Sequence, residues 1–423
     1  MTNPRLISAQ IIQKILEEKV FFGELKKQIG EKDLPFCNML ILTVLRHLRA
    51  ISQILNSFLS RKIPHKHRLA EYLLWCAVAE ILFMETAEYA VLNETVKNIR
   101  KVSDKFLSAM ANAVLRRVCA QKENLLVQAR QIMPLSDSFL EILEGYTAEQ
   151  IAQIADCVMV APPLDLSCKQ NPQELVSQLD ADLLPNGSLR LYHHPRINQI
   201  PAYSAGIWWV QDAAAALPVQ TLGDISAKTA IDLCAAPGGK TAQLCAKGAA
   251  VTALDISALR LETLKQNMLR LGFNNIKTQA TDALEYLQNA DALYDIVLLD
   301  APCSATGTFR RHPEVLHIKS KNDVKEQAVL QKKLLNACRN ILKIGGILVY
   351  SVCSISKTEG ELQIADFLKE NPDFKIVPIT KQDIGCWEDA LILADGTVRT
   401  LPYYAKSQGG MDSFFICKMQ RII

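Results

Sequence analysis

The chain has 423 residues, of which 49% are hydrophobic and 22% charged, and its net charge is +3. These values are typical of globular proteins, and the length predicts two or three domains, each able to bury its own core. No apolar run reaches the roughly 18 residues that a membrane-spanning helix needs. Met1 to Arg5 lead directly into an amphipathic pattern without a signal peptide, so we expect a cytoplasmic protein.

The 12 cysteines are scattered and form neither a Cys-x-x-Cys pair nor a Cys/His spacing typical of a metal site. In a chain of this length without a secretory signal, we expect reduced thiols. The sequence therefore predicts neither a disulfide framework nor a bound metal.

Charge is distributed unevenly along the chain. Through Arg130 there are 20 Lys and Arg against 12 Asp and Glu, whereas the remainder has 27 against 32. A basic front part followed by an acidic part indicates that one attracts a polyanion while the other carries out chemistry. Ordinary solvated helix faces remain the alternative interpretation.

The front of the chain, from residue 4 to about 130, has apolar residues at helical spacing throughout. Pro35 and Pro64 punctuate this pattern. A basic loop at 61–68 contains two histidines but has no acidic or thiol partner nearby in sequence, so we interpret it as solvated or phosphate-facing. Residues 1–130 are thus predicted to form an all-α domain.

The middle of the chain, residues 131–225, predicts a linker and a small α+β module. Pro162 and Pro163 lead into a strand-like run at 164–168, and Asn186-Gly187 is a turn signal before a second run at 189–192. The pair Trp208 and Trp209 is predicted to pack in a core, with a stacking surface as the alternative.

The last part, residues 226–423, alternates buried strands with helices and therefore predicts a doubly wound, Rossmann-like α/β domain. The expected strands lie at 230–233, 250–254, 276–280, 295–299, 346–350 and 412–418, and the expected helices include 259–271 and 323–342.

Ligands of such sheets bind at the carboxyl ends of the strands, and the residues with functional chemistry fall there. A glycine turn follows the first strand, and Asp255, 23 residues after Asp232, stands where a carboxylate receives ribose hydroxyls. Asp282 and Asp300 end the next two strands. Because neither G-x-G-x-x-G nor a P-loop occurs, S-adenosylmethionine is a better prediction than NAD or ATP.

Two cysteines, Cys303 and Cys353, follow later strands. A thiolate that adds to C6 of cytosine makes C5 nucleophilic, and a carboxyl group beside it assists by hydrogen bonding the N3 edge. Asp300, three residues before Cys303, is suitably placed for that task. Spacing alone leaves open which cysteine attacks.

Three motifs carry a family resemblance: Asp-Leu-Cys-Ala-Ala-Pro-Gly-Gly-Lys-Thr at 232–241, Leu-Leu-Asp-Ala-Pro-Cys-Ser-Ala-Thr-Gly at 298–307 and Leu-Val-Tyr-Ser-Val-Cys-Ser at 348–354. They resemble those of the Nol/Nop/Sun RNA cytosine-C5 methyltransferases. Residues 92–96 and 113–117 are similar to the NusB-like helical domain fused to a bacterial 16S ribosomal RNA enzyme of this family. The resemblance covers nearly the whole chain and is weakest between about 131 and 200.

The resemblance implies roles for individual residues. Cys353 matches the nucleophile, and Cys303 matches a residue that assists release of the methylated base. Lys240, Arg310 and Arg311 are implied to contact RNA, with further RNA binding by the NusB-like domain. The implied contacts of S-adenosylmethionine are Cys234, Ala235, Ala236, Pro237, Gly238, Gly239, Lys240, Asp255, Asp282 and Asp300.

The chain departs from the family pattern in three places. Val352 stands where the family has Thr, and the Pro-Glu-Glu-Asn that follows the second cysteine appears as 357–360, Lys-Thr-Glu-Gly, which retains Glu359. An Arg-x-Asn of the middle module is replaced around 167–169.

Together these features predict a monomeric enzyme that forms 5-methylcytosine in 16S ribosomal RNA through a covalent cysteine–C6 adduct. Two alternatives remain open. The substrate is another RNA, such as transfer RNA, or the chain is a catalytically inactive RNA-binding factor in ribosome assembly, which Val352 favours.

Overall fold

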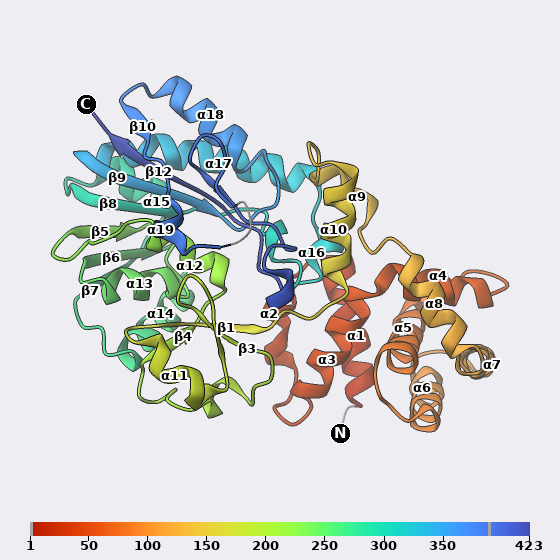
Figure 1. The fold of residues 1–423 in the computed structure, drawn as a ribbon. Helices are drawn as coiled ribbons and strands as arrows, with labels where there is room; N and C mark the ends of the chain where they lie inside the picture. The colour runs from red at the N-terminus through yellow and green to blue at the C-terminus, as the bar shows by residue number, and fades with distance from the viewer. Residues whose placement is uncertain (1–2, 388–390) are drawn as a thin grey trace. The chain divides into compact units, whose positions relative to one another are not determined.

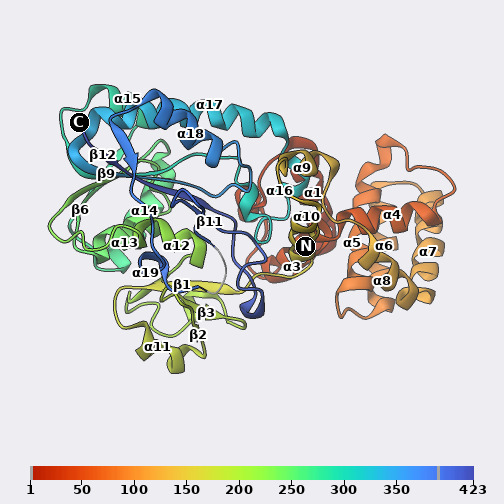
Figure 2. The same ribbon diagram turned by 45° about the horizontal axis from the view of Figure 1, so that its top comes forward.

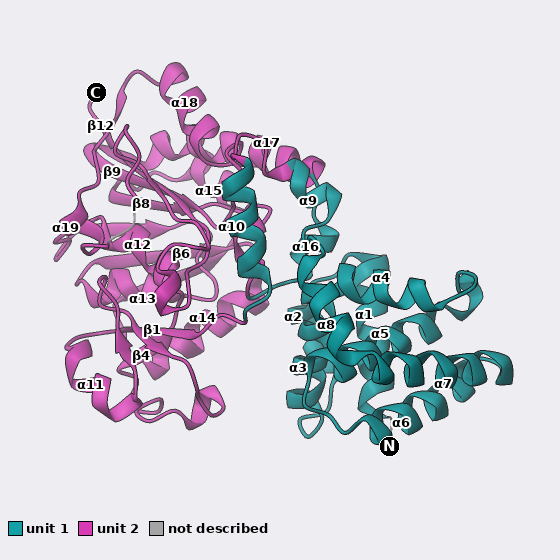
Figure 3. Cartoon of the chain, turned by 45° about the vertical axis from the view of Figure 1, so that its right-hand side comes forward, with its two compact units in different colours: residues 1–141, 148–160, 311–320 teal, residues 142–147, 161–310, 321–423 magenta. Residues whose placement is uncertain are grey.

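The computed structural model describes residues 3–387 and 391–423. These residues form two compact units, each discontinuous in sequence (Figure 3). Unit 1 comprises residues 1–141, 148–160 and 311–320, and unit 2 comprises 142–147, 161–310 and 321–423. Residues 1–2 and 388–390, which fall within the domains expected at 1–130 and 226–423, lie outside the described residues. The linear domain boundaries at 130 and 225 stay a prediction.

Unit 1 is helical, as the periodicity of residues 4 to 130 predicts. Its helices are α1 (Pro4–Glu18), α2 (Phe22–Leu25), α3 (Leu34–Arg46), α4 (Leu48–Phe58), α5 (Arg68–Phe83), α6 (Glu88–Val102), α7 (Lys105–Ala120), α8 (Lys122–Gln131), α9 (Asp137–Ile142), α10 (Ala148–Val158) and α16 (Val315–Ile318), with short 3-10 helices η1 (Lys26–Gln28) and η2 (His65–His67). Helix α5 is apolar almost all round and forms the centre of the core, in contact with α1, α3, α4, α6 and α7. Its one buried carboxylate, Glu80, receives two hydrogen bonds from Arg5, at 2.7 and 2.6 Å.

Within the described ranges, no single helix has both the length and the apolar composition of a membrane span. The pair formed by α3 and α4 meets that requirement only when taken together, and these two helices are bent by 77° at their break.

A short segment from late in the chain, residues 311–320, belongs to unit 1. Buried Glu314 accepts a hydrogen bond from the Phe22 backbone N–H at 3.2 Å. The His317 Nε2 atom lies 2.7 Å from the carbonyl oxygen of Leu45. Burial lowers the pKa of His317 to about 4, so the ring is neutral at pH 7 and donates its N–H to this carbonyl.

Unit 2 contains a small antiparallel sheet in the order β2-β3-β1-β4. Its elements are β1 (Leu164–Cys168), β2 (Asp182–Leu183), β3 (Leu189–Leu191), β4 (Trp208–Val210), α11 (Pro172–Leu179) and η3 (Ile197–Gln199). Trp208 and Trp209 are both buried, which agrees with packing rather than a stacking surface. Arg190, fully buried, donates to both oxygens of Asp165 at 2.7 Å and to the carbonyls of Gln408 and Gly410 at 2.8 Å. This arginine therefore fastens the small sheet to the C-terminal part of the same unit.

The large sheet of unit 2 has eight strands in the order β10-β12-β9-β8-β5-β6-β7, with β11 paired to β12. The strands are β5 (Thr229–Asp232), β6 (Ala250–Asp255), β7 (Ile276–Ala280), β8 (Tyr294–Asp300), β9 (Leu342–Val352), β10 (Phe374–Ile376), β11 (Val398–Arg399) and β12 (Phe415–Arg421). Strands β5 to β9 are parallel to one another. At one side of the sheet, β12 pairs antiparallel with β9, and β10 pairs antiparallel with β12.

Helices cover both faces of this sheet (Figures 1 and 2). They are α12 (Ala213–Gln220), α13 (Gly239–Ala246), α14 (Ala258–Arg270), α15 (Ala283–Asn289), α17 (Lys321–Cys338), α18 (Glu361–Glu370) and α19 (Lys381–Ile384), with η4 (Thr306–Thr308), η5 (Arg339–Ile341) and η6 (Lys406–Gln408). Side chains of α15, α17 and α18 share one core cluster, and those of α12, α13, α14 and α19 pack in the clusters of the other face. The expected fold class, helical front part, small α+β module and doubly wound α/β domain, is confirmed.

Candidate active site

The strand order reverses between β5 and β8, and the expected site residues lie at this switch point. The glycine turn follows β5, while Asp255 and Asp300 are the last residues of β6 and β8. Asp282 caps α15 directly after β7, and Cys353 follows β9. The structure thus brings the expected cofactor residues and both thiols to one edge of one sheet within unit 2.

The glycine turn is held by its backbone geometry and by one buried carboxylate. Gly238 has φ +105°, a backbone conformation that other residues rarely adopt. A Cβ at this position would also lie only 3.0 Å from Cγ of Leu264, so both the backbone and the packing disfavour a larger residue. Asp255 accepts hydrogen bonds from the N–H groups of Ala236, at 3.1 Å, and Ser257, at 2.9 Å. Its side chain therefore braces the turn, and its expected contact with ribose stays a prediction.

Asp232 lies buried at the end of β5. The Thr241 hydroxyl donates to its Oδ2 atom at 2.7 Å, while Oδ1 has no hydrogen-bond partner among the described residues. Burial raises the pKa of Asp232 to about 7. Burial also raises the pKa of the neighbouring Cys234 thiol, so this cysteine is a neutral part of the turn rather than a nucleophile.

Lys240 and Asp300 form an ion pair across the switch point, with the Lys240 Nζ and Asp300 Oδ2 atoms 2.7 Å apart. The other oxygen of Asp300 accepts a hydrogen bond from the Ser351 hydroxyl at 2.7 Å. Burial alone would lower the pKa of Lys240, but the Asp300 carboxylate raises it above its ordinary value. The pair links the glycine turn to the strand that leads to Cys303.

The two thiols face each other, with Sγ of Cys303 and Sγ of Cys353 separated by 3.3 Å. The hydrogen bond with Cys353, followed by burial, raises the pKa of Cys303 well above its ordinary value. Because the largest cause of this shift is the other thiol, the shift describes the pair, and either sulfur is able to donate to the other. The structure brings the two thiols together, and the assignment of Cys353 as the nucleophile and Cys303 as its partner stays a prediction.

Buried Glu359 binds the chain segments that carry both thiols. Its Oε1 atom accepts from the Ser304 N–H at 2.8 Å and from Nε2 of Gln331 at 2.9 Å. Its Oε2 atom accepts from the hydroxyls of Ser304 and Ser354, each at 2.5 Å. Ser304 follows Cys303 and Ser354 follows Cys353, so one carboxylate fixes both cysteine-bearing loops.

In the sequence, Glu359 is recognisable only as the glutamate retained from the family motif, and no role for it follows from that. The signal for a role was the pair of serines, one after each cysteine. A serine hydroxyl next to each thiol predicts a shared acceptor, but the sequence does not identify it. Tyr350 strengthens the arrangement because its hydroxyl donates to the backbone carbonyl of Glu359 at 2.6 Å.

The arginines expected to contact RNA have different environments. Arg310 is buried, and its guanidinium donates to the carbonyl of Gly409. Arg311 is half-buried and belongs to unit 1. The Lys240 side chain is largely buried and is paired with Asp300. Its Nζ atom lies over the Phe414 ring, 5.1 Å from the ring centroid. RNA contacts of all three residues stay predictions.

Comparisons with known proteins agree along nearly the whole chain. Residues 219–420 match a family model described as 16S rRNA methyltransferase RsmB/F, and residues 2–120 match a model described as the NusB family. The ribosomal RNA small subunit methyltransferase B of Erwinia tasmaniensis is 31% identical over 398 residues, which span 89% of this chain and 92% of that protein.

Solved structures show the same fold at lower identity. The protein PH0851 has a TM-score of 0.71 at 22% identity, with 99% of each chain covered. NSun6 from Pyrococcus horikoshii, crystallised with SFG, has a TM-score of 0.59 at 17% identity and covers 68% of this chain and 98% of its own.

Replacing Glu359 tests whether its carboxylate holds the site. Glu359→Ala leaves the Ser304 N–H and the Gln331 amide without their acceptor, so we expect the free energy of unfolding to fall by about 3 kcal/mol. Glu359→Gln keeps one acceptor oxygen and should cost only about 1 kcal/mol. Urea unfolding measures both. Cys353 is alkylated in the folded protein, and mass spectrometry of the peptide that contains it measures the extent of reaction. The rate of this alkylation should differ between the alanine variant and the wild type. Equal stability and equal alkylation rates in wild type and Glu359→Ala would contradict this role.

The raised pKa of Asp232 predicts a pH-dependent stability. Because the folded chain holds this proton more tightly than the unfolded chain, the stabilisation is complete below the ordinary value of 3.8 and is lost as the pH rises toward 7. The Tm of wild type minus that of Asp232→Asn should therefore decrease between these pH values, by at least about 2–4 °C. Differential scanning calorimetry of both proteins measures this difference, and a constant difference would contradict it.

Proposed function

The chain belongs to the RsmB/F family of 16S rRNA methyltransferases, and from this premise we propose that it methylates C5 of a cytosine in 16S ribosomal RNA. The expected family and the expected NusB-like front part are both confirmed by the matches to relatives. The observation that carries the proposed chemistry is the thiol pair, 3.3 Å apart, beside the Lys240–Asp300 ion pair at the switch point. Action on ribosomal RNA agrees with the expected cytoplasmic location.

The proposed cofactor is S-adenosylmethionine, and the chemistry of the switch point supports it. Asp255 provides a carboxylate beside the glycine turn, and Asp282 provides another just after β7, as a nucleoside with a cationic group requires. Lys240, the cation of the turn, is already neutralised by Asp300, which disfavours a pyrophosphate at this position. The residues that would hold the cofactor are the expected set, 234–240, Asp255, Asp282 and Asp300. When bound, S-adenosylmethionine supplies the methyl group for C5.

The reaction begins with addition of the Cys353 thiolate to C6 of cytosine. The new S–C6 bond moves the C5=C6 electron pair onto C5 and the N3 edge of the ring. The Asp300 carboxylate accepts a hydrogen bond from the exocyclic amino group beside N3, since N3 of cytosine itself carries no proton. Lys240, 2.7 Å from Asp300, supplies a positive charge that stabilises the displaced electron density. Both groups are already fixed in place by the ion pair and by Ser351.

After C5 gains the methyl group, a base removes the C5 proton. The electrons of the C5–H bond restore the C5=C6 double bond, and the S–C6 bond breaks to release the Cys353 thiolate. The protonated Cys303, within hydrogen-bond distance of the Cys353 sulfur, stabilises that thiolate as it leaves. The division of labour is the one that the family resemblance implies, and the 3.3 Å separation of the two sulfur atoms allows it.

The proposed function is tested by methyl transfer from labelled S-adenosylmethionine. We expect incorporation into unmodified 16S RNA or 30S components, detected as 5-methylcytosine after nuclease digestion and mass spectrometry. Transfer RNA is the comparison substrate. Incorporation of label into transfer RNA instead would indicate that the enzyme methylates that RNA. A well-folded protein that labels neither RNA would contradict catalysis and favour a binding factor in ribosome assembly.

Alanine variants of the two cysteines test the mechanism. Cys353→Ala should abolish methylation because the S–C6 bond cannot form. Cys303→Ala should permit attack but slow release, so that a covalent protein–RNA adduct accumulates on denaturing gels. If Cys353→Ala remained active while Cys303→Ala formed no adduct, the two roles would be reversed.

A further inference from the structure

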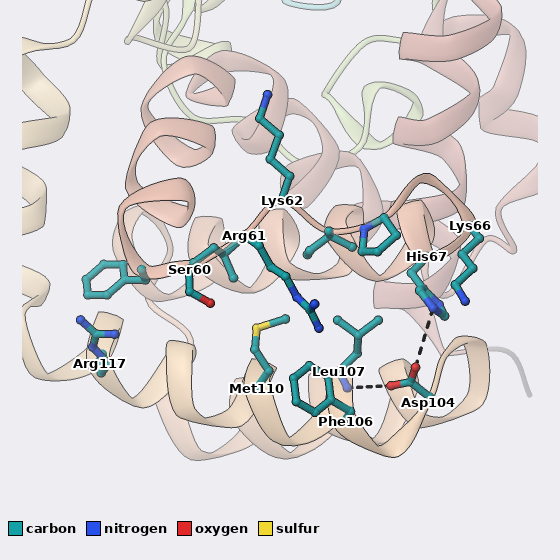
Figure 4. A pocket seen from close by; sticks show the side chains of 14 residues that line it. Ser60, Arg61, Lys62, Lys66, His67, Asp104, Phe106, Leu107, Met110 and Arg117 are labelled. Carbon is teal, nitrogen blue, oxygen red and sulfur yellow. Dashed lines mark hydrogen bonds and ion pairs between the residues drawn. The ribbon is translucent and has the colours of Figure 1, made fainter.

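Unit 1 contains a cavity of about 420 Å³ between the segment 58–67 and α7 (Figure 4). Its apolar walls include Phe58, Ile63, Phe106 and Met110. A volume of this size is in the range of small-ligand sites and is large enough for a nucleotide. Nothing in the proposed reaction uses this cavity.

Four cations line the cavity: Arg61, Lys62, Lys66 and Arg117. Within the described part of the chain, none of the four is within ion-pair distance of a carboxylate. The Lys62 side chain points away from the others, whereas Arg61 is directed toward α7, between Lys66 on one side and Arg117 on the other (Figure 4). The cavity consequently has an uncompensated positive charge and favours an anionic ligand.

The single carboxylate among the lining residues, Asp104, has another task. Its Oδ1 atom accepts from the Leu107 N–H at 2.8 Å and so caps α7. Its Oδ2 atom lies 3.7 Å from Nε2 of His67, and the Nδ1 atom of that ring lies 2.9 Å from the Ser103 hydroxyl. Asp104 is therefore held at the end of the cavity, and the four cations outnumber this one carboxylate.

The cavity also exposes an aromatic ring. Phe106 is 64% exposed, and the Arg61 guanidinium carbon lies 5.7 Å from its centroid. Arg117 is placed similarly over Phe58, at 4.8 Å. An exposed ring beside a guanidinium group, with further cations in the same cavity, is the combination on which unpaired nucleic-acid bases stack while their phosphates meet positive charge.

We propose that this cavity binds an unpaired nucleotide of the RNA substrate, with the base against Phe106 and the phosphodiester held by Arg61, Lys66 and Arg117. The proposal rests on the proposed function, because that function identifies the polyanion as RNA. An acidic protein segment would pair with the cations but would not account for the exposed Phe106 ring. Stacking on Phe106 also predicts a preference for single-stranded over duplex RNA.

The test measures binding of a fluorescently labelled single-stranded RNA oligonucleotide to the full chain by anisotropy. Phe106→Ala should weaken binding about tenfold, the typical effect of losing one stacked base. Tyr89→Ala is the matched control, since Tyr89 is an exposed aromatic of the same unit, on α6 and outside the cavity. Arg117→Ala should weaken binding and reduce the salt dependence by about one counterion, whereas Arg116→Ala, its neighbour on α7, should have a smaller effect.

Inorganic polyphosphate, a competitor with charge but no bases, separates stacking from charge. Phe106→Ala should leave polyphosphate binding unchanged, and Arg117→Ala should weaken it. If Phe106→Ala and Tyr89→Ala bound single-stranded RNA equally well, or if duplex RNA were preferred, the proposal would be overturned. Methyl transfer is measured separately. Loss of RNA binding in Phe106→Ala supports the cavity even if the chain methylates no RNA, and unchanged binding refutes the cavity even if methylation is observed.

Discussion

The site depends on keeping the ends of β8 and β9 together beyond the point where the sheet stops. The last paired residues are Asp300 and Ser351, yet each thiol lies farther along its segment. Past that point, two features hold the segments: the Gly307 N–H donates to the Cys353 carbonyl at 3.0 Å, and Glu359 accepts from both sides. Without the buried carboxylate, the donors around it would have to be hydrated or left unsatisfied, and either change would separate the sulfur atoms.

Close packing of the backbone adds to this constraint at Gly307. A Cβ on this residue would lie 2.0 Å from the carbonyl oxygen of Ser413, a distance that no side chain tolerates. The Ser413 N–H also donates to the Gly307 carbonyl at 3.0 Å. The chain before β12 therefore closes over the loop that carries Cys303, and glycine is required because two backbones meet there.

A good part of this arrangement was predictable from the sequence, because buried strands are short apolar runs and ligand-binding residues follow them. The strand pattern alone therefore predicts that Asp255, Asp300 and Cys353 lie at one edge of the sheet. The role of Glu359 cannot be predicted in this way, since its contacts reach Ser304, 55 positions away, and no local periodicity encodes such a pairing.

The assignment of separate chain segments to one unit could not be predicted from the sequence either. Residues 311–320 lie between the second and the third methyltransferase motif in the sequence, but Val315, Leu316 and Ile318 are buried in unit 1. A single helical turn has no detectable periodicity, and its burial follows from tertiary contacts such as that of Glu314 with the Phe22 backbone. Arg310 and Arg311 are adjacent in sequence yet belong to different units for this reason. Adjacency in a motif is thus a weak guide to shared function where the chain leaves one unit for another.

The functions proposed for the two units, thiol chemistry and the attraction of RNA, have opposite electrostatic requirements. Activating a thiol and stabilising a displaced charge need a few charges in a water-poor site, where each is paired, as Lys240 is with Asp300. Attracting RNA needs many solvated cations without carboxylate partners, as around Arg61 and Arg117. A single surface cannot meet both requirements, because unpaired cations next to the thiols would stabilise either thiolate and remove the distinction between Cys303 and Cys353. Under the proposed function, the excess of basic residues in the front part of the chain, and of acidic residues in the rest, corresponds to this separation.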